Sequence, residues 1–399
     1  MKPAILNKGL IGVLLCFVVL NIYKTKNLYS HPDYPYDARN VFIAGSLWLE
    51  GKNPYNDSLL KAEWQNIAAQ NNLNTTKPPG FKDCGMIYPF WSIPILVPYY
   101  LFSWSVAKQI IWILSWLFIL IIAWFASKSF GIKALNFWLW LVILIAFKSS
   151  LVAVALGQPL LMSLAAIMAS WYFYTKNKEA LSGILLGIAM LKVTLCIPFV
   201  ILFLANKKWK LIFFLSIFPI VAALSFYMVS GNLNIPEMFE NMATQMQINY
   251  AGPTLTAINT NLTELGILFN YFNGTDYKFI SMLNLFTLLF GIIILVGFYL
   301  KGFLKEYSFL GLLILWNFLF SYHLIYDCLL LVFLVPLVKT NGHEKWIWLV
   351  LFAPLFLPIN GIFKNTDWVQ FHLPITLLAL FLYLVYEMTK NEISNQEQN

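Results

Sequence analysis

Long apolar blocks constrain this chain more than any other feature. Stretches of about 15 to 25 residues with almost no charge recur along it, close to the length that a helix needs to cross a bilayer. One of them reads "IIWILSWLFILIIAWFA" at residues 110–126 and is apolar on every side, unlike the alternating strands of a barrel. Hydrophobic residues make up 60% of the 399 positions and charged residues 11%, with a mean hydropathy of +0.70. The sequence therefore predicts an all-α polytopic membrane protein.

Polar connections separate the apolar blocks, and none is large enough to fold as a soluble domain. We predict one membrane domain, residues 1–399, with a first extracytoplasmic loop at 23–86 that carries surface helices and a second loop at 230–278. The expected bundle has roughly 10–12 transmembrane helices. The apolar runs lie at residues 10–22, 88–102, 109–126, 135–147, 159–174, 181–205, 211–229, 279–300, 309–338, 346–359 and 371–388.

Lysines in short loops predict the orientation. They gather at residues 176–178, 207–210, 301–306 and 339–345, and such loops face the cytoplasm. The net charge of +8 is thus an orientation signal and does not indicate nucleic-acid binding. We expect the first run to be an uncleaved helix with a cytoplasmic N-terminus. Run 309–338 is too long for one span, so we expect a hairpin whose tip, residues 321–327, reaches water at the outer face.

The runs between residues 88 and 174 do not fit this orientation if each is one span. Their number would place Lys176 outside, so one of them is re-entrant or split. The proline-containing "YPFWSIPILVPYY" (88–100) and the polar break "ALGQP" (155–159) are the two candidate positions. The sequence leaves both open.

Asp37 is the first residue that could carry chemistry. Tyr36, Asn40, Ile43 and Leu47 fall on one face of a helix, which "EGKNPY" would end through its glycine and proline. We expect this helix to lie on the outer membrane surface, with Asp37 at the boundary with water. The alternative is an ordinary solvated acid that caps a helix.

Lys192 is the second candidate. It lies inside "ALSGILLGIAMLKVTLCIPFVILFLA", and a lysine at the bilayer centre costs about 2.5 to 3.5 kcal/mol on insertion scales. Cations flank both ends of the run. This pattern favours a broken or re-entrant segment with Lys192 at a break near Pro198, facing an aqueous cavity. The alternative is a side chain that extends to an interface.

His323 and Asp327 form the third candidate, since residues four apart share a face of a helix. Two ligands are too few for a metal site. The pair could contact substrate or could be a mutually satisfied polar pair at a helix end. Gln158 in "LGQP" and Asn261 in "NTNLTEL" belong to the same side in this topology. Sequence motifs of zinc proteases, nucleotide-binding enzymes and serine hydrolases do not occur.

Five segments occur in a characteristic order along the chain: "YDARNVFIAGSLWLEGKNPY", "YPF", "LGQPLLMSLAAIMA", "LSGILLGIAMLKVTLCIPF" and "SYHLIYDCLLLVFLVPL". In these segments the chain resembles the GT-C glycosyltransferases, and more closely glycosyltransferase family 87, the polyprenol-phosphate-mannose-dependent mannosyltransferases. Two features depart from the family pattern: Phe90 replaces a second proline, and "NTNLTEL" lacks an expected serine and arginine.

The resemblance implies a hexosyltransferase that moves a sugar such as mannose from a polyprenyl-phosphate donor to a lipid- or glycan-linked acceptor. The reaction would invert the sugar and need no cofactor or metal, on the extracytoplasmic face of the plasma (inner) membrane, within cell-envelope assembly. Expected partners are donor, acceptor and membrane lipids, with no nucleic acid. Asp37 would be the catalytic base, because such a transfer needs a group that takes the acceptor proton. The expected substrate-binding residues are Lys192, His323, Asp327, Gln158, Tyr88 and Asn261.

Two other classes of function compete with the transferase. A polytopic transporter or a lipid or glycan flippase could also use a buried lysine and broken helices. Transporters commonly show two related halves, and we find no second copy of the "DARN" or "LGQP" segments. A noncatalytic membrane partner in envelope assembly is the third class.

Overall fold

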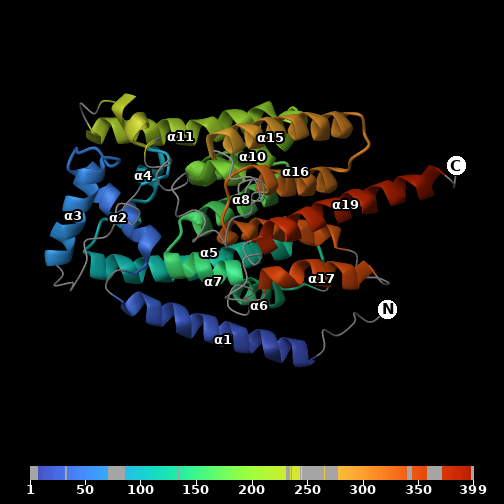
Figure 1. Cartoon of the computed structure of the whole chain (residues 1–399), viewed down its shortest axis with the longest axis horizontal. Coiled ribbons are helices and arrows are strands. Elements are labelled where there is room, and N and C mark those ends of the chain that lie inside the picture. The colour runs from blue at the N-terminus through green and yellow to red at the C-terminus, as the bar shows by residue number, and fades with distance from the viewer. Residues whose placement is uncertain are drawn as a thin grey trace. The chain divides into compact units, whose positions relative to one another are not determined.

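The computed structural model describes residues 8–31, 34–70, 86–132, 135–230, 234, 236–242, 244, 265, 277–338, 344–356 and 371–396 (Figure 1). In these ranges the chain is helical and contains no strand, which confirms the all-α prediction. The helices are α1 (Lys8–Ser30), α2 (Tyr36–Leu49), α3 (Asp57–Gln70), α4 (Ser92–Ile95), α5 (Trp104–Ser129), α6 (Phe137–Ala146), α7 (Lys148–Leu156), α8 (Leu160–Thr175), α9 (Glu179–Ala189), α10 (Val193–Ala205), α11 (Trp209–Ser230), α15 (Tyr277–Leu300), α16 (Glu306–Phe320), α17 (Glu344–Phe356) and α19 (His372–Gln396), and the 3₁₀ helices are η2 (Val97–Tyr99), η3 (Met190–Lys192) and η5 (Ile325–Leu337).

Several helices are long and apolar enough to cross a membrane, so the chain is a multi-pass membrane protein. Among the described residues five meet this standard, or six if the bent pair α6 and α7 is one span. By length and composition alone, the five are Trp104–Ser129, Glu179–Ala205, Trp209–Val229, Met282–Leu300 and His372–Lys390, of which Glu179–Ala205 is interrupted by η3. Three shorter apolar helices, α8, α16 and η5, accompany them. The count of 10–12 spans stays a prediction.

The chain folds as two compact units, each described here by itself. Unit 1 comprises Met1–Val193 and Lys210–Pro253, and unit 2 comprises Thr194–Trp209 and Thr254–Asn399. Whether both act as one domain, as the sequence predicts, stays a prediction. Of the second loop, 230–278, only a few positions are described.

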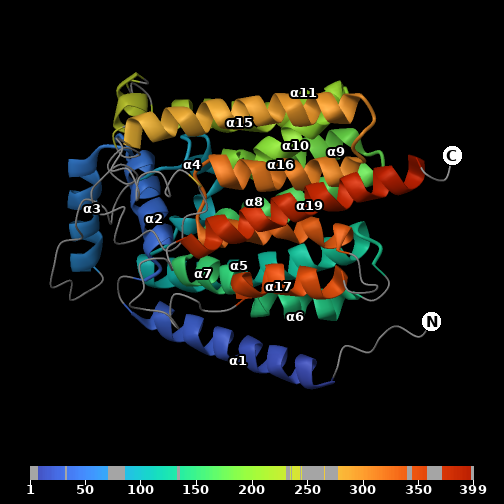
Figure 2. The same cartoon turned by 45° about the vertical axis from the view of Figure 1, so that its right-hand side comes forward.

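In unit 1, helix α5 packs against α8 and α6, and α2 and α3 stand crosswise to α1 and α5 (Figures 1 and 2). Hydrogen bonds tie α1 along the bent pair. The Asn21 amide donates to the Ile145 carbonyl at 2.7 Å, and the Tyr29 hydroxyl donates to the Val154 carbonyl at 2.7 Å. Helix α1 continues to Ser30, into the predicted first loop.

The predicted irregularity between residues 88 and 174 is present. Run 88–102 forms only α4 and η2, which are far too short to span a bilayer. The run at 135–147 does not end where predicted: α6 passes into α7 through a bend of 71° at Phe147. One apolar run is therefore too short to cross, and the conflict over Lys176 is removed if the bent pair α6 and α7 is one span.

The Lys192 segment turns back. Helix α9 packs along α11 through two glycines: a Cβ on Gly187 would lie 2.7 Å from the Leu215 carbonyl oxygen, and one on Gly183 would overlap the Leu211 carbonyl. A straight helix rises about 1.5 Å per residue, so a straight Glu179–Ala205 could not bring Leu211 back to Gly183. The chain must reverse between them. The break in the helix is η3, which contains Lys192, whereas Pro198 lies within α10.

Helix α2 forms over the predicted stretch. Most of it is buried in the apolar core of unit 1, and its place on the membrane surface stays a prediction. Its neighbours are α3, α4, η2 and α7. A side chain on Gly45 would overlap the Tyr100 ring, so this glycine lets η2 approach. The segment ends at Gly51, whose φ of +70° suits glycine.

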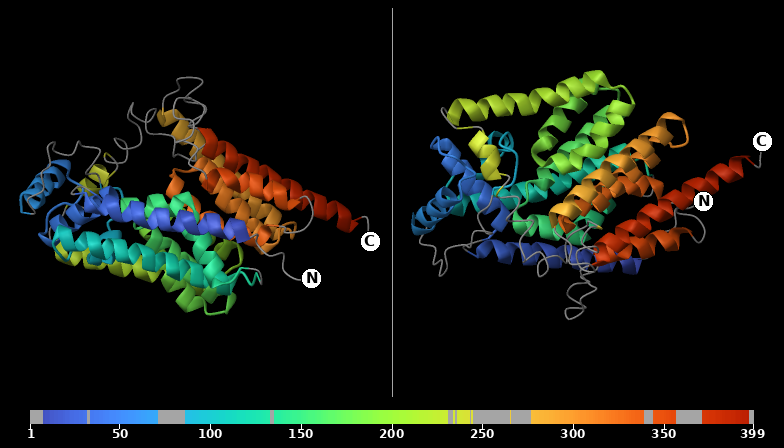
Figure 3. Two further views of the ribbon diagram at one scale, coloured as in Figure 1. Left: turned by 90° about the horizontal axis from the view of Figure 1, so that it is seen from below. Right: turned by 45° about the horizontal axis from the view of Figure 1, so that its top comes forward.

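In unit 2, α16 is flanked by α15 and α19 and forms a hairpin with η5 (Figure 3). The predicted hairpin over 309–338 is thus confirmed. At the opposite end from its tip, Asn206 receives a 2.6 Å hydrogen bond from the Tyr299 hydroxyl and donates to Glu306 at 3.3 Å. The lysine loops at 207–210 and 301–306 therefore share one end of the unit, as predicted. The side of the membrane stays a prediction.

Candidate active site

Asp37 occupies the first turn of α2, directly after Pro35 and Tyr36. The partial positive charge at a helix N-terminus favours a carboxylate there. The side chain is only partly exposed. Its Oδ2 accepts a hydrogen bond from the Gln158 amide. Among the residues that the structure describes, Oδ1 has no donor, so this oxygen is open to accept a proton from another molecule.

A chain of hydrogen bonds orients Gln158. The Tyr88 hydroxyl donates to Gln158 Oε1 at 2.7 Å, which turns the amide NH₂ toward Asp37. The Tyr55 hydroxyl in turn donates to the Tyr88 carbonyl at 2.6 Å, and the Tyr55 amide donates to Asn53 Oδ1 at 3.0 Å. Segments of the sequence that lie far apart, "NPY", "YPF" and "LGQP", thus converge on one carboxylate.

Gly157 makes this convergence sterically feasible. Its φ is +64°, which ends α7 in the left-handed region. A Cβ at this position would lie 2.7 Å from Ala38 Cβ and 2.9 Å from Pro35 Cγ. The missing side chain therefore lets the end of α7 contact the start of α2. Gln158 follows immediately and is placed against Asp37.

Lys192 lies at the turn of the re-entrant segment. Two hydrogen bonds hold this turn: the Ser163 hydroxyl donates to the Ala189 carbonyl at 2.5 Å, and the Trp91 indole donates to the Met190 carbonyl at 3.2 Å. The Lys192 side chain is partly exposed. Its positive charge lowers the pKa of Asp37.

The electrostatic setting of Asp37 suits proton transfer near neutrality. Burial raises the pKa of Asp37 from 3.8 to about 6. The Gln158 amide and the charges of Lys192 and Arg39 act in the opposite direction and keep the ionised form accessible. A carboxyl group with a pKa of about 6 is ionised at pH 7 and is a stronger base than an ordinary aspartate.

The predicted substrate-binding residues differ in how far the structure exposes them. Gln158 is 2% exposed and Tyr88 is 8% exposed, and both use their polar atoms within the protein. Their predicted role in substrate binding stays a prediction. Asn261 lies outside the described residues. Lys192 is partly exposed, and its role in substrate binding stays a prediction.

His323 and Asp327 lie in unit 2 and form a closed pair. His323 Nδ1 is 3.3 Å from Asp327 Oδ2, and His323 Nε2 is 2.9 Å from the Asn317 amide nitrogen. Asp327 Oδ2 also accepts from the Leu324 amide at 3.1 Å, as a cap of η5. The pair does not share a regular helix face, and exposures of 0% and 1% place it away from water. The prediction of a water-accessible tip is wrong for these side chains, because the helix cap turns them inward.

Several residues of this centre are not among those predicted from the sequence. Arg39 is 2% exposed, with its guanidinium 5.0 Å from the Trp64 ring and 5.1 Å from the Tyr36 ring. A charge two residues after Asp37 in "DARN" was an available signal. Tyr55 and Trp91 belong to quoted motifs but received no role. In the described ranges, no group of three or more His, Cys, Asp or Glu side chains could hold a metal ion.

The fold and this centre define a membrane-embedded protein with a poised carboxylate beside a cation. The sequence profile of glycosyltransferase family 87 matches residues 86–322, more than half of the 399-residue chain. The chain therefore belongs to glycosyltransferase family 87 and is a glycosyltransferase. No curated protein and no solved structure matches it. The matched segment includes Tyr88, Gln158 and Lys192 but not Asp37, so the role of Asp37 rests on geometry.

Proposed function

We propose that this glycosyltransferase moves a hexose such as mannose from a polyprenyl-phosphate donor to a hydroxyl of a lipid- or glycan-linked acceptor. One observation carries the proposal: an Asp37 carboxylate with one oxygen fixed by Gln158 and the other open, beside the charge of Lys192. The site faces the extracytoplasmic side of the plasma membrane in this proposal, in line with the lysine loops.

The reaction is a single displacement. The acceptor hydroxyl oxygen forms a bond to the anomeric carbon while the bond from that carbon to the phosphate oxygen breaks. Asp37 Oδ1 takes the hydroxyl proton, and polyprenyl phosphate leaves with the bonding electron pair. The anomeric configuration inverts because attack and departure occur on opposite faces.

Lys192 would stabilise the leaving phosphate. A fixed cation beside the site of developing negative charge stabilises the transition state more than the ground state. The two hydrogen bonds that anchor its turn hold this charge in place before substrate binds. Gln158 and Tyr88 act through Asp37 by fixing the orientation of its carboxylate.

The test is turnover by purified full-length protein. A panel of polyprenyl-phosphate hexoses and pentoses is offered with a membrane lipid extract as acceptor, and release of polyprenyl phosphate is followed. Wild type should turn over one hexose donor, with inversion in the product. Asp37→Asn should be inactive but folded. Asp57→Asn, which changes a surface acid paired with Lys61, serves as the matched control and should be fully active.

Two outcomes would contradict the proposal. Equal turnover by Asp37→Asn and wild type would remove Asp37 as the base. Turnover confined to nucleotide-sugar donors would remove the polyprenyl-phosphate donor class while leaving the family unchanged.

A further inference from the structure

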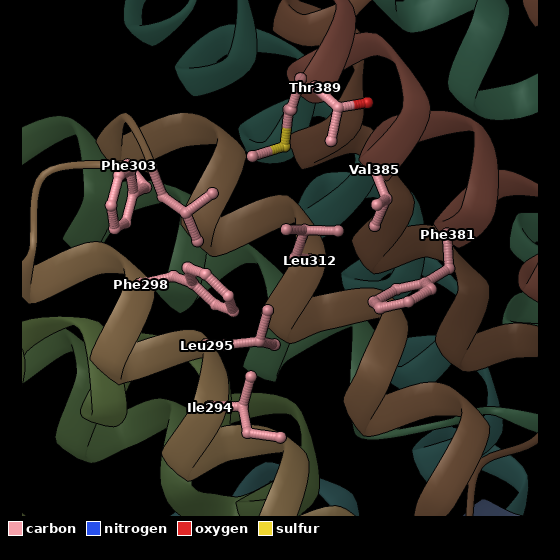
Figure 4. A pocket seen from close by; sticks show the side chains of 10 residues that line it. Ile294, Leu295, Phe298, Phe303, Leu312, Phe381, Val385 and Thr389 are labelled. Atoms are coloured by element: carbon pink, nitrogen blue, oxygen red, sulfur yellow. The ribbon is translucent and has the colours of Figure 1, made fainter. Parts of the chain in front are cut away.

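An apolar groove lies within unit 2, and its lining shares no residue with the Asp37 centre or with the His323 and Asp327 pair. Side chains of α15, α16 and α19 converge on it, and it encloses about 380 Å³ (Figure 4). That volume is within the usual range for a bound small molecule, about 300 to 1,000 Å³. The main lining residues are Leu295, Phe298, Leu312, Phe381, Val385 and Thr389.

The position of the groove restricts what can occupy it. It opens between Met282–Leu300 and His372–Lys390, both long and apolar enough to span a membrane. Apart from the Thr389 hydroxyl, which donates to the Tyr386 carbonyl at 2.9 Å, and the Met388 sulfur, the lining side chains offer only carbon. A hydrocarbon chain is the chemistry that such a surface accepts within a bilayer.

The groove lies at the lysine-rich end of the unit. Phe303 and Leu304 close it at the turn after α15, and exposed lysines adjoin them in sequence: Lys301 precedes Phe303 by two positions and Lys305 follows Leu304. Lys390, also exposed, follows Thr389. Spans end here, so these cations lie at the depth of lipid head groups.

Two carboxylates at this end make hydrogen bonds within the unit: Glu306 accepts one from Asn206, and Glu387 is 5% exposed and accepts one from Tyr383 at 3.1 Å. Among the side chains that the structure describes here, the fully exposed charges are those of lysines. An apolar slot with a basic rim at the end of membrane spans has the complementarity of a lipid with a hydrocarbon tail and an anionic head.

We propose that this groove is a binding site for one anionic phospholipid, with an acyl chain between α15 and α19 and its phosphate at Lys301 and Lys305. The site is separate from the Asp37 centre and does not depend on the proposed sugar transfer. A bound lipid would stabilise unit 2, since a ligand that binds only the folded state raises its stability.

The test compares phosphatidylglycerol with phosphatidylcholine of the same acyl chains. Each is added to delipidated full-length protein in a neutral detergent, and bound lipid is counted by native mass spectrometry while the thermal midpoint is recorded. Wild type should retain one phosphatidylglycerol and show a larger rise in midpoint with it than with phosphatidylcholine.

Paired variants separate the head group from the chain. Lys301→Gln with Lys305→Gln should weaken phosphatidylglycerol binding about tenfold, whereas Lys176→Gln with Lys178→Gln, an exposed pair in unit 1, should leave it unchanged. Val385→Trp should fill the groove and abolish retention. Leu382→Trp, on an exposed face of α19, should not.

Equal binding of the two lipids by wild type would overturn the proposal, because it would describe a nonspecific lipid belt. Loss of binding in the Lys176 and Lys178 pair equal to that in the groove pair would also overturn it, in favour of general surface charge. Unchanged retention in Val385→Trp would place the lipid elsewhere.

Discussion

Two carboxylates on this chain have opposite surroundings. Asp37 in unit 1 is partly exposed, receives one hydrogen bond and has an open oxygen. Asp327 in unit 2 is 1% exposed and meets both His323 and the Leu324 amide. The sequence treats both as candidate site residues. The comparison teaches that residue type alone does not distinguish a reactive carboxylate from a structural one. The number of partners that the carboxylate has within the protein does distinguish them.

The largest expected difference between the two is in catalysis. Asp37→Asn removes the base and should lower kcat by a factor of about 10² to 10⁴. Asp327→Asn should keep kcat within a few-fold of wild type once the folded fraction is counted. Single-turnover rates on protein quantified by size-exclusion chromatography measure both. An equal loss of kcat in the two variants would show that Asp37 and Asp327 do not differ in their contribution to catalysis.

Lys192 should have the next largest effect. Lys192→Met keeps the length of the side chain and removes the charge that acts on Asp37. A charge-assisted hydrogen bond contributes about 1.5 to 3 kcal/mol, so a loss of about 10- to 100-fold in kcat is expected. Lys192→Arg should recover part of it. The rate of donor turnover at saturation is the measurement, and an unchanged rate in Lys192→Met would place Lys192 outside the reaction.

The pH profile sharpens the comparison. Activity that needs ionised Asp37 should rise with pH through an inflection near 6 and be lost as pH falls below it. The Gln158 amide lowers the pKa of Asp37, so Gln158→Leu should move the inflection to higher pH and reduce kcat about tenfold. Rates measured from pH 4.5 to 8.5 test both shifts.

Tyr29→Phe is the matched control for that profile. It also removes one buried hydrogen bond, from the Tyr29 hydroxyl to Val154, but leaves Asp37 untouched. Its inflection should stay where wild type has it. Identical profiles for Gln158→Leu and wild type would show that the amide does not set the charge of Asp37.

The smallest effect, and the clearest in sign, concerns stability. The folded-state pKa of Asp37, about 6, exceeds the value near 3.9 expected in the unfolded chain. The folded state therefore holds a proton that the unfolded state has lost between these values, and its stability falls as pH rises from about 4 to 6. Asp37→Asn removes this deficit and should stabilise the protein at pH 7.5 by about 1 to 3 kcal/mol.

Asp327→Asn should act in the opposite direction. It weakens hydrogen bonds that a buried carboxylate makes at the start of η5, at a cost of about 1 to 3 kcal/mol. Thermal midpoints of both variants at pH 4.5 and 7.5 are the measurement. Stabilisation by Asp327→Asn would mean that the charge of Asp327, like that of Asp37, destabilises the folded protein.

The sequence determined the class of fold and the local form of many elements. Apolar runs longer than a bilayer crossing require helices, because only helices satisfy the backbone within hydrocarbon in single segments. The helix over "YDARNVFIAGSLWL", its stop at "EGKNPY" and the hairpin after residue 309 follow from periodicity and from glycine and proline chemistry. The lysine loops correctly indicated which turns share an end of unit 2.

Only the tertiary structure decided which polar residues act together. The reversal at Lys192 depends on Gly183 and Gly187 packing against α11, a contact between segments that local patterns do not encode. Gln158 reaches Asp37 because Gly157 has no side chain and lets the end of α7 contact the start of α2. His323 and Asp327 are buried because Asp327 caps the start of η5. Burial and partner number arise from packing between distant segments, so a sequence can nominate a carboxylate but only the fold determines whether its oxygen stays open.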